Sequence, residues 1–321
     1  MLLVELPHWL VHGTAIALGL CFGSFLNVVI HRLPRDLNLA YPPSTCPHCN
    51  APIAARDNVP LLGWMLLRGK ARCCGAPINA RYPIIEALGG LLAWALVVAR
   101  IHPLADQIDV GHAALLFATY LALGLGLIAL AFIDLEFMIL PDSLTLGGTA
   151  LGLASTFYRD DLSLTESAIG AGAGFVGIWL PFIWAYQKLR GFPGMGLGDA
   201  KLIMLSGAWF GTWGAVFALF AGALQGTVAA LVIYAVQGKL TEPAQVTAER
   251  EELKRAIEEA EGEERIELER ILRDDPLGDD PATGLSGARM AFGPFLSLAC
   301  LELLLFQTAF RNFLLTRDFL L

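Results

Sequence analysis

Apolar residues gather into runs long enough to cross a bilayer, separated mostly by short polar connections. A bilayer core needs about 20 mostly apolar residues per helix. Such runs lie at roughly 13–30, 83–99, 112–133, 143–158, 168–187, 202–213, 215–236 and 291–310. They predict an all-α polytopic membrane protein with about eight transmembrane helices. The pair within 202–236 is divided only at Gly211-Thr-Trp-Gly214, and its first member is short.

Two long polar segments interrupt this pattern and set the predicted domain boundaries. Residues 1–30 hold the first transmembrane helix and residues 31–82 form a loop with four cysteines. Residues 83–236 form the transmembrane core, 237–290 a charged helical insert, and 291–321 the last transmembrane helix and tail. The first run lacks a basic leading region and a small-residue cleavage site, so we interpret it as a retained helix.

Composition supports a membrane protein. Hydrophobic residues make up 55% of the 321, charged residues 16%, and the mean hydropathy is +0.58. These values exclude nucleic-acid binding through a basic surface, global disorder and a disulfide-stapled secreted module. The net charge of -8 belongs to one segment, because residues 237–290 hold 8 basic and 15 acidic side chains.

The insert is rich in helix-forming charged residues from about Thr247 to Arg273, with Gly262 placed to divide the helix in two. The sequence DDPLGDDPATGLSG that follows is typical of turns and linkers. Two interpretations stay open, a solvated spacer between two spans and a docking site for a partner.

Basic residues fix the predicted orientation. No Lys or Arg precedes the first span, whereas seven follow it within residues 31–82. Placing that loop in the cytoplasm puts 18 basic residues inside and four outside, which are Arg100, Arg159, Arg311 and Arg317. Cytoplasmic loops carry this excess, so we expect an extracytoplasmic N-terminus.

Two carboxylates at the membrane boundary suggest chemistry. Asp134 ends the apolar run IALAFIDLEFMILPD, and Asp199 lies in GMGLGDAK at the start of another. An ionised side chain there is costly unless it has water, a partner or a task. Two carboxylates brought together keep one proton between them, so one can act as a general base on water and the other as a general acid.

Capping offers a simpler interpretation of these residues. Asp142 follows a proline and could cap the next helix, and Asp199 could cap its own, with Lys201 reaching toward the lipid headgroups. Gly196 and Gly198, together with Gly194, argue against capping alone, because glycine permits positive φ and close backbone approach beside an extended substrate.

Together these motifs resemble the type IV prepilin peptidases, which belong with the GxGD membrane aspartyl proteases. The similarity rests on GMGLGDAK, on Asp134 spaced from Pro141-Asp142, on CFGSFLNVVIHRLP (21–34), on APINARYPIIEALGG (76–90) and on GPFLSLA (293–299). It covers nearly the whole chain apart from 237–290. A lone GxGD is a weak signal, but the ordered set is specific.

The resemblance implies Asp134 and Asp199 as the catalytic pair, with Asp142, Lys201, Gly196 and Gly198 in support. It implies a bacterial inner-membrane enzyme that cleaves the basic leader of type IV prepilins or type II secretion pseudopilins on the cytoplasmic side. It also implies N-methylation of the new terminus with S-adenosylmethionine. Glu86, an intramembrane acid in the N-terminal half, is a supporting candidate for methyl transfer. No glycine-rich loop places that cofactor.

The cysteines fit a structural zinc site only with a departure from the family pattern. Cys46-Pro-His-Cys49 has the expected spacing, but the second pair is the adjacent Cys73-Cys74, and alignment on GAPI places the missing thiol at Ala71. Zinc held by four thiolates, completion of the site by His48, and a weakened or empty site remain open. A disulfide is not expected on the cytoplasmic face.

Two other functions compete with the peptidase. A transporter would use Asp134, Asp199 and Glu86 as a proton or cation relay, and it predicts paired repeats and carboxylates near the bilayer midplane. A non-enzymatic assembly scaffold would dock partners through 237–290. The sequence leaves the oligomeric state and the choice between pilin and pseudopilin open.

Overall fold

The computed structural model describes residues 1–191, 193–238, 242–274 and 290–315, and within these ranges its regular structure is helical. The longer helices are α1 (His8–Arg32), α3 (Arg81–Leu96), α4 (Val110–Phe137), α5 (Asp142–Ser155), α6 (Leu164–Ile178), α8 (Leu197–Gln237), α9 (Ala244–Glu259), α10 (Gly262–Asp274) and α11 (Gly293–Leu315). The shorter elements are η1 (Leu3–Glu5), η2 (Leu33–Arg35), η3 (Ala55–Asp57), α2 (Leu62–Leu66), η4 (Val97–Ile101), η5 (His102–Leu104), η6 (Trp179–Ala185) and α7 (Tyr186–Arg190).

Five helices in the described ranges are long and apolar enough to cross a membrane. They cover His8–Arg35, Arg81–Leu104, Val110–Phe137, Leu164–Arg190 and Leu197–Gln237, and a shorter apolar helix covers Gly293–Gln307. The prediction of an all-helical membrane protein is therefore confirmed. The predicted run 143–158 corresponds to α5, whose 14 residues rise only ~21 Å, less than a full hydrocarbon core.

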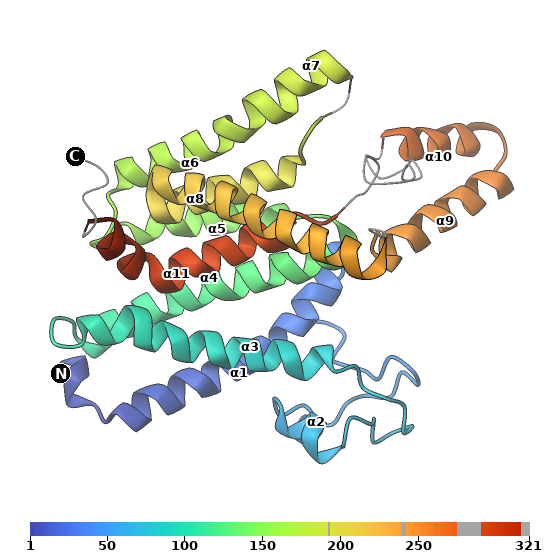
Figure 1. The fold of residues 1–321 in the computed structure, drawn as a ribbon. Helices are drawn as coiled ribbons and strands as arrows, with labels where there is room; N and C mark the ends of the chain where they lie inside the picture. The colour runs from blue at the N-terminus through green and yellow to red at the C-terminus, as the bar shows by residue number, and fades with distance from the viewer. Residues whose placement is uncertain (192, 239–241, 275–289, 316–321) are drawn as a thin grey trace.

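Helix α8 turns back on itself at Gly211. That residue has φ 71° and ψ -171°, a conformation outside the helical region. The Ser206 hydroxyl donates to the Gly214 carbonyl oxygen at 2.9 Å, although residues eight apart in a straight helix are separated by ~12 Å. Figure 1 shows the second half of α8 returning along the first. The predicted division of 202–236 at Gly211 is thus confirmed.

Side chains from neighbouring segments satisfy the carbonyl groups that this turn releases. Ser167 on α6 donates to the Ala208 carbonyl at 2.5 Å, and Arg159 donates to the Trp209 carbonyl at 2.9 Å. Arg159 is buried and also pairs with Asp161. A buried carbonyl without a partner costs about 1–3 kcal/mol, so these contacts stabilise the reversal.

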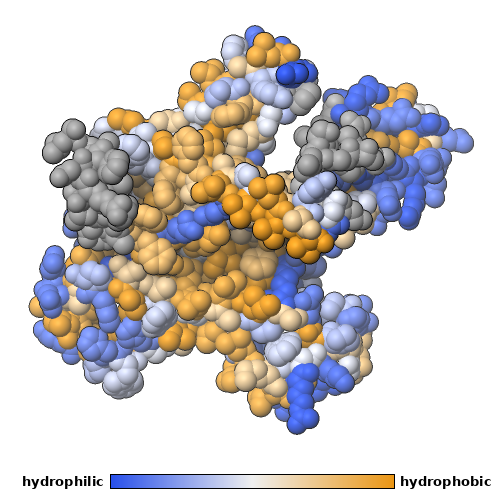
Figure 2. All heavy atoms as spheres, in the orientation of Figure 1, coloured by the Kyte–Doolittle hydropathy of each residue, from blue (hydrophilic) through white to orange (hydrophobic). Residues whose placement is uncertain are grey.

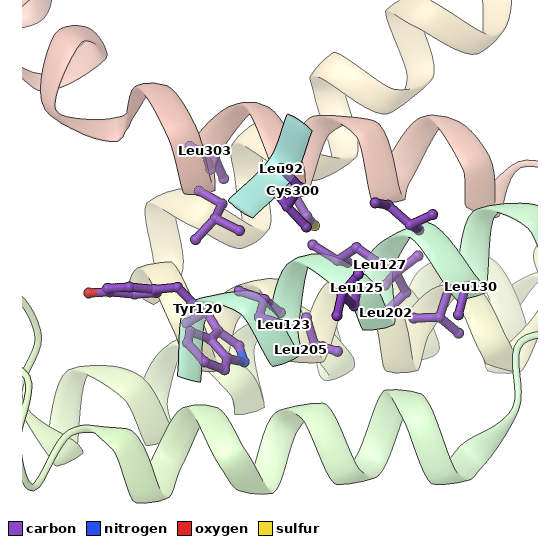
Figure 3. Close-up of a cluster of buried hydrophobic side chains, with 14 of the residues drawn as sticks. Leu92, Tyr120, Leu123, Leu125, Leu127, Leu130, Leu202, Leu205, Cys300 and Leu303 are labelled. Atoms are coloured by element: carbon purple, nitrogen blue, oxygen red, sulfur yellow. The ribbon is translucent and has the colours of Figure 1, made fainter. Parts of the chain in front are cut away.

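The core lies where α3, α4, α8 and α11 meet. Figure 3 shows leucines of α4 facing those of α8, with Leu92 of α3 and Cys300 of α11 beside them. All of the residues that it labels are at most 8% exposed. This layer fixes α4 against the two helices whose first turns lie beside Asp134 and Asp199.

Glycine pairs allow two helix crossings to be very close. A Cβ built at Gly19 of α1 would lie 2.4 Å from the Gly89 oxygen of α3, and one at Gly170 of α6 would lie 2.4 Å from the Gly207 oxygen of α8. Small residues at such crossings are typical of membrane helices. The first crossing brings Gly23 against the backbone of Glu86.

The cysteine loop and the charged insert lie at the same end of the molecule. In Figure 1 the cysteine loop around α2 and the helices α9 and α10 project from the end opposite the N-terminus. Figure 2 shows hydrophilic residues over these parts and a broad apolar surface between them. Gly262 (φ 61°) separates α9 from α10, as predicted; most of the predicted linker, residues 275–287, lies outside the described residues.

Candidate active site

Asp134 and Asp199 each lie close to the first turn of a helix. Asp134 lies in the last turn of α4 and is 5% exposed. Its Oδ2 accepts a hydrogen bond at 2.8 Å from the N–H of Gly293, which is the first residue of α11. Asp199 lies in the first turn of α8, and a Cβ built at Gly196 would lie 3.1 Å from its Oδ2. Helix N-termini carry partial positive charge and favour carboxylates.

The side chain of Leu140 packs against the glycines that lie beside the two acids, Gly198 and Gly293. A Cβ built at Gly198 would lie 2.9 Å from the Leu140 Cβ, and one at Gly293 would lie 2.9 Å from its Cδ2 and 2.7 Å from the Asp134 Oδ2. The two carboxylates are near enough to interact electrostatically. The structure therefore brings together the two aspartates that the sequence singled out, from helices more than sixty positions apart in the chain.

The simpler interpretation of Asp142 and Lys201 is wrong. Helix α5 starts at Asp142 with Pro141 as its N-cap, and no side-chain capping bond forms. Asp142 instead pairs with Lys201 at 2.5 Å, and the Lys201 side chain is only 18% exposed. The bridge ties the start of α5 to the start of α8, so Lys201 is engaged in an ion pair rather than reaching out to headgroups. Asp199 does not cap α8 either, because the N-cap residue is Gly196 and Asp199 lies within the first turn of the helix.

The glycines around Asp199 serve close approach and not positive φ. Gly196 has φ -70°, and neither Gly194 nor Gly198 has a positive φ. At Gly198 a side chain would collide with Leu140, and at Gly194 it would press on the Tyr186 ring at 3.0 Å. The expected positive φ is thus wrong, and the glycines instead allow close packing within the chain, against Leu140 and Tyr186.

Glu86 links the membrane bundle to the cysteine loop. Its Oε1 accepts from the Ser24 hydroxyl at 2.8 Å, and its Oε2 accepts from the Leu61 N–H at 2.7 Å. Leu61 has φ 60° and ψ -50°, which closes a γ-turn in which the Leu62 N–H bonds to the Pro60 oxygen at 2.6 Å. A non-glycine residue in this region is strained, so the carboxylate holds the loop in an unfavourable conformation.

The cysteine loop contains two similar turns that face each other. In the first turn, the Cys46 N–H bonds to the Ala51 oxygen and the Asn50 N–H bonds to the Cys46 oxygen. In the second turn, the Ala71 N–H bonds to the Ala76 oxygen and the Gly75 N–H bonds to the Ala71 oxygen. The missing cysteine is therefore at Ala71, as the GAPI alignment indicates, and Cys74 corresponds to Cys49.

Cys73 supplies the missing thiol. The sulfur atoms of Cys46, Cys49, Cys73 and Cys74 lie within 4.8 Å of one another, in a group that does not include His48. Cys49 and Cys73 are 3.3 Å apart, Cys46 and Cys74 3.7 Å. Zn–S bonds of about 2.3 Å in a tetrahedron separate sulfurs by ~3.8 Å, so the four thiols fit zinc.

The thiols differ in acidity. The N–H groups of His48 and Cys49 lower the pKa of Cys46 to about 6, so this group is mostly thiolate at neutral pH. Contact with Cys49 raises the pKa of Cys73 to about 12. All six cysteines are free thiols in this structure.

Two cavities in the described part of the chain lack the charged side chains that would suit S-adenosylmethionine. A shallow groove of about 430 Å³ on α1, lined by Trp9, Thr14 and Cys21 among others, holds no charged side chain. A cavity of about 120 Å³ between α4, α5 and α8 is likewise uncharged. Neither includes Glu86, so no residue is assigned to this cofactor.

Some contacts at the site were not predicted. Gly293 was noted only as part of GPFLSLA, and its N–H on Asp134 depends on a contact across 159 positions. Arg81 forms an ion pair with Glu136 that joins α3 to α4. The transporter alternative predicted carboxylates near the bilayer midplane, whereas Asp134 and Asp199 lie in terminal turns.

Comparisons with known proteins agree with this geometry. The Bacterial Peptidase A24 N-terminal domain matches residues 17–100, and the Type IV leader peptidase family matches residues 121–231. The chain is 42% identical to a prepilin leader peptidase/N-methyltransferase of Aeromonas hydrophila over 237 residues, 65% of this chain and 78% of the relative. It is 41% identical to one of Klebsiella pneumoniae over 199 residues, 60% and 82% respectively, and 38% identical to one of Burkholderia pseudomallei over 256 residues, 70% and 78%. No solved structure matches significantly.

Proposed function

The chain belongs to the peptidase A24 family of prepilin leader peptidases, and we propose that it is an aspartic endopeptidase and N-methyltransferase that processes prepilins or pseudopilins. The observation that carries the peptidase is the meeting of Asp134 and Asp199 around Leu140 at the polar end of the bundle. The substrates are those that the relatives' names and the family resemblance indicate.

In the proposed mechanism the two aspartates share one proton. The ionised carboxylate removes a proton from water while the water oxygen bonds to the scissile carbonyl carbon. The protonated partner gives its proton to the carbonyl oxygen. The collapse of this intermediate breaks the C–N bond, and the leaving amine takes up the proton that the base received. Gly293 supports this chemistry by holding the Asp134 carboxylate, and Gly196 lies beside the Asp199 carboxylate.

Asp142 and Lys201 act as positioning residues. Their ion pair joins the connection after α4 to the first turn of α8, and both ends flank an aspartate. Gly198 supports the same arrangement because it lets α8 approach Leu140. We assign Gly196 a supporting role beside Asp199, because a side chain at Gly196 would press on the Asp199 carboxylate.

The proposed architecture has eight spans. The eight spans are four long helices, the two halves of α8, and two shorter helices. The long helices are α1, α3, α4 and α6, and the shorter ones are α5 and α11. The cysteine loop and 237–290 then lie in the cytoplasm of a bacterium, with the active site on the cytoplasmic side of the inner membrane. The apolar part of the prepilin lies among the spans, and its basic leader stays in the cytoplasm. Zinc has a structural role in the loop.

Glu86 is proposed to act in methyl transfer. S-adenosylmethionine supplies the methyl group, and a nearby carboxylate can bind the new N-terminal ammonium and remove its proton. Glu86 is suited to this because Ser24 and the Leu61 N–H orient it where the loop meets the bundle.

The test is a two-product assay on the purified full chain in liposomes. A prepilin is added with S-adenosylmethionine, and mass spectrometry reads leader removal and addition of a methyl group separately. We expect both products from the wild type and only the cleaved, unmethylated product from Glu86→Gln. A wild type that leaves several prepilins and pseudopilins uncleaved contradicts the peptidase. Normal methylation by Glu86→Gln contradicts the role of that residue alone.

A further inference from the structure

Three histidines gather at the end of the bundle opposite the cysteine loop. His8 is the first residue of α1, His12 lies one turn later, and His102 begins η5 after the end of α3. Each offers a ring nitrogen, and the three nitrogens lie within 4.8 Å of one another. The ring centroids of His8 and His102 are 5.2 Å apart, and those of His12 and His102 are 4.8 Å apart.

The fold itself creates this cluster. Residues four apart share one face of a helix, so His8 and His12 project together. The close crossing of Gly19 and Gly89 aligns α1 with α3 and brings the end of α3 to that face. Nothing in the proposed peptidase or methyltransferase chemistry uses these residues.

One ring nitrogen of the cluster lacks a hydrogen-bond partner. The His12 Nδ1 is buried and has none in the described part of the chain. Buried polar atoms are normally paired, and an unpaired one costs about 1–3 kcal/mol. His112, at the same end, shows the ordinary arrangement, because its Nε2 contacts the Tyr158 carbonyl oxygen at 2.9 Å. A metal ion bound through the His12 Nδ1 would give this nitrogen the partner that it lacks.

We propose that His8, His12 and His102 form a site for a divalent transition metal, with Zn²⁺ as its occupant. Neutral imidazole suits Zn²⁺ and its neighbours in the transition series, while Mg²⁺ and Ca²⁺ require oxygen ligands. Tetrahedral Zn–N bonds of about 2.0–2.1 Å separate the nitrogens by ~3.4 Å, so ligation draws the rings together by ~1.4 Å at most. Three protein ligands leave a fourth position for water.

The site would fasten the start of α1 to the end of α3. All of α3 and most of α1 lie within residues 17–100, which match the N-terminal domain of the family, and the two helices carry Glu86 and Ser24. A metal here therefore stabilises the helix pair that holds Glu86, through a binding site separate from the four cysteines.

Cobalt binding tests this site apart from the cysteine loop. The full chain is purified in detergent without a histidine tag, with Cys46→Ser and Cys49→Ser introduced to disable the thiol site. Co²⁺ is then titrated and its visible absorption recorded. We expect one equivalent of Co²⁺ to bind, with an absorption spectrum typical of nitrogen ligands and without a thiolate charge-transfer band. His12→Ala and His102→Ala should each abolish this Co²⁺ spectrum, and His112→Ala should leave it unchanged.

Two outcomes overturn the proposal. One is the absence of a Co²⁺ spectrum in the cysteine-substituted chain when the chain is folded; the other is a spectrum that survives both His12→Ala and His102→Ala. If the cysteine substitutions prevent folding, the wild type is compared with His12→Ala, and the difference spectrum must lack thiolate bands. Zn²⁺ should also raise the unfolding temperature of the His112→Ala chain more than that of His12→Ala.

Discussion

At the scale of single residues, a backbone N–H group holds one of the proposed catalytic acids. The Gly293 N–H donates to the Asp134 Oδ2 at 2.8 Å, and a Cβ at Gly293 would lie only 2.7 Å from that oxygen. Any side chain at Gly293 would therefore push the Asp134 carboxylate or the Leu140 side chain aside. The position of the reactive carboxylate thus depends on a residue with no chemistry of its own.

Gly293→Ala should displace Asp134 and lower leader cleavage. Displacements of about 1 Å at a catalytic group can cost ~10²-fold in rate, and we expect a loss of that order in kcat/KM. Gly126→Ala on α4 is the matched control, because a Cβ there has no neighbour within 4 Å. Equal cleavage by the two variants would show that Gly293 does not position Asp134.

The identity of the fourth thiol is a second question at this scale. The structure assigns Cys73 to the cluster and leaves His48 out. We expect Cys73→Ser to weaken zinc binding by the loop and His48→Ala to leave it unchanged, because serine lacks the thiolate that zinc prefers. Competition with a chelator measures the zinc affinity of the loop, and the chain carries His12→Ala so that the histidine site does not contribute. The opposite order, with His48→Ala the weaker binder, would restore the histidine alternative.

At the scale of helices, the reversal of α8 depends on Arg159. Its guanidinium bonds to the Trp209 carbonyl, to Ser155 and to Asp161, and it lies over the Trp209 ring at 5.0 Å. Arg100 contacts Asp161 as well, at 3.0 Å. Burial alone would raise the pKa of Asp161, but hydrogen bonding and charge from Arg159 and Arg100 outweigh it and hold that pKa below its usual range.

Arg159→Met should destabilise the protein by about 2–4 kcal/mol, because it leaves a buried carbonyl and a carboxylate without their partner. Unfolding by heat or denaturant in detergent measures this. Arg265→Met, which removes an exposed pair within α10, should change stability by less than ~0.5 kcal/mol. Comparable losses in both variants would mean that the reversal does not depend on Arg159.

The ion pair between Arg159 and Asp161 makes the stability of the protein depend on pH. The pKa of Asp161 is lower folded than unfolded, where it is about 3.9, so the pair stabilises the protein above that pH. The contribution is lost as the pH falls through the folded value. The difference in stability between wild type and Arg159→Met should therefore shrink below about pH 4.

The limits of prediction from the sequence also belong to this scale. The apolar runs located the helices, and the scarcity of charge within them singled out Asp134 and Asp199. The pairs Asp142–Lys201 and Glu86–Leu61 could not be predicted, because they join positions far apart whose contact depends on helix crossings. The sequence predicted the turn at Gly211, but it did not predict the hydrogen bond from Arg159 to the Trp209 carbonyl that stabilises this turn. The four-residue spacing of His8 and His12 indicates that they share one face of a helix, but nothing in the sequence indicates that His102 lies beside them.

At the scale of the whole molecule, the insert contacts the helix that carries Asp134. Helix α9 contacts α4, and Val246 and Arg250 are buried, while α10 folds back along α9 (Figure 1). Arg250 pairs with Glu242 at 2.6 Å, with both side chains nearly inaccessible. The acidic insert is therefore attached to the bundle through α9, and α10 is its exposed part.

Val246→Asp should loosen this attachment. Placing a charge at a buried apolar position costs about 1–3 kcal/mol or more, and we expect a lower unfolding temperature with reduced leader cleavage. Ile266→Asp on α10, where the side chain is 67% exposed, is the control and should change neither. If Val246→Asp cleaves normally but assembly of pili or the secretion system fails in cells, the insert serves as a docking site for a partner instead.

The central claim is that Asp134 and Asp199 together hydrolyse the leader peptide bond. The most direct measurement is cleavage of a prepilin by purified Asp134→Asn and Asp199→Asn beside the wild type, with Asp106→Asn as a surface control. Asparagine keeps the size of the side chain and removes its acid–base function, so each variant should lose at least ~10²-fold in rate while staying folded. Wild-type rates in both variants would contradict the account.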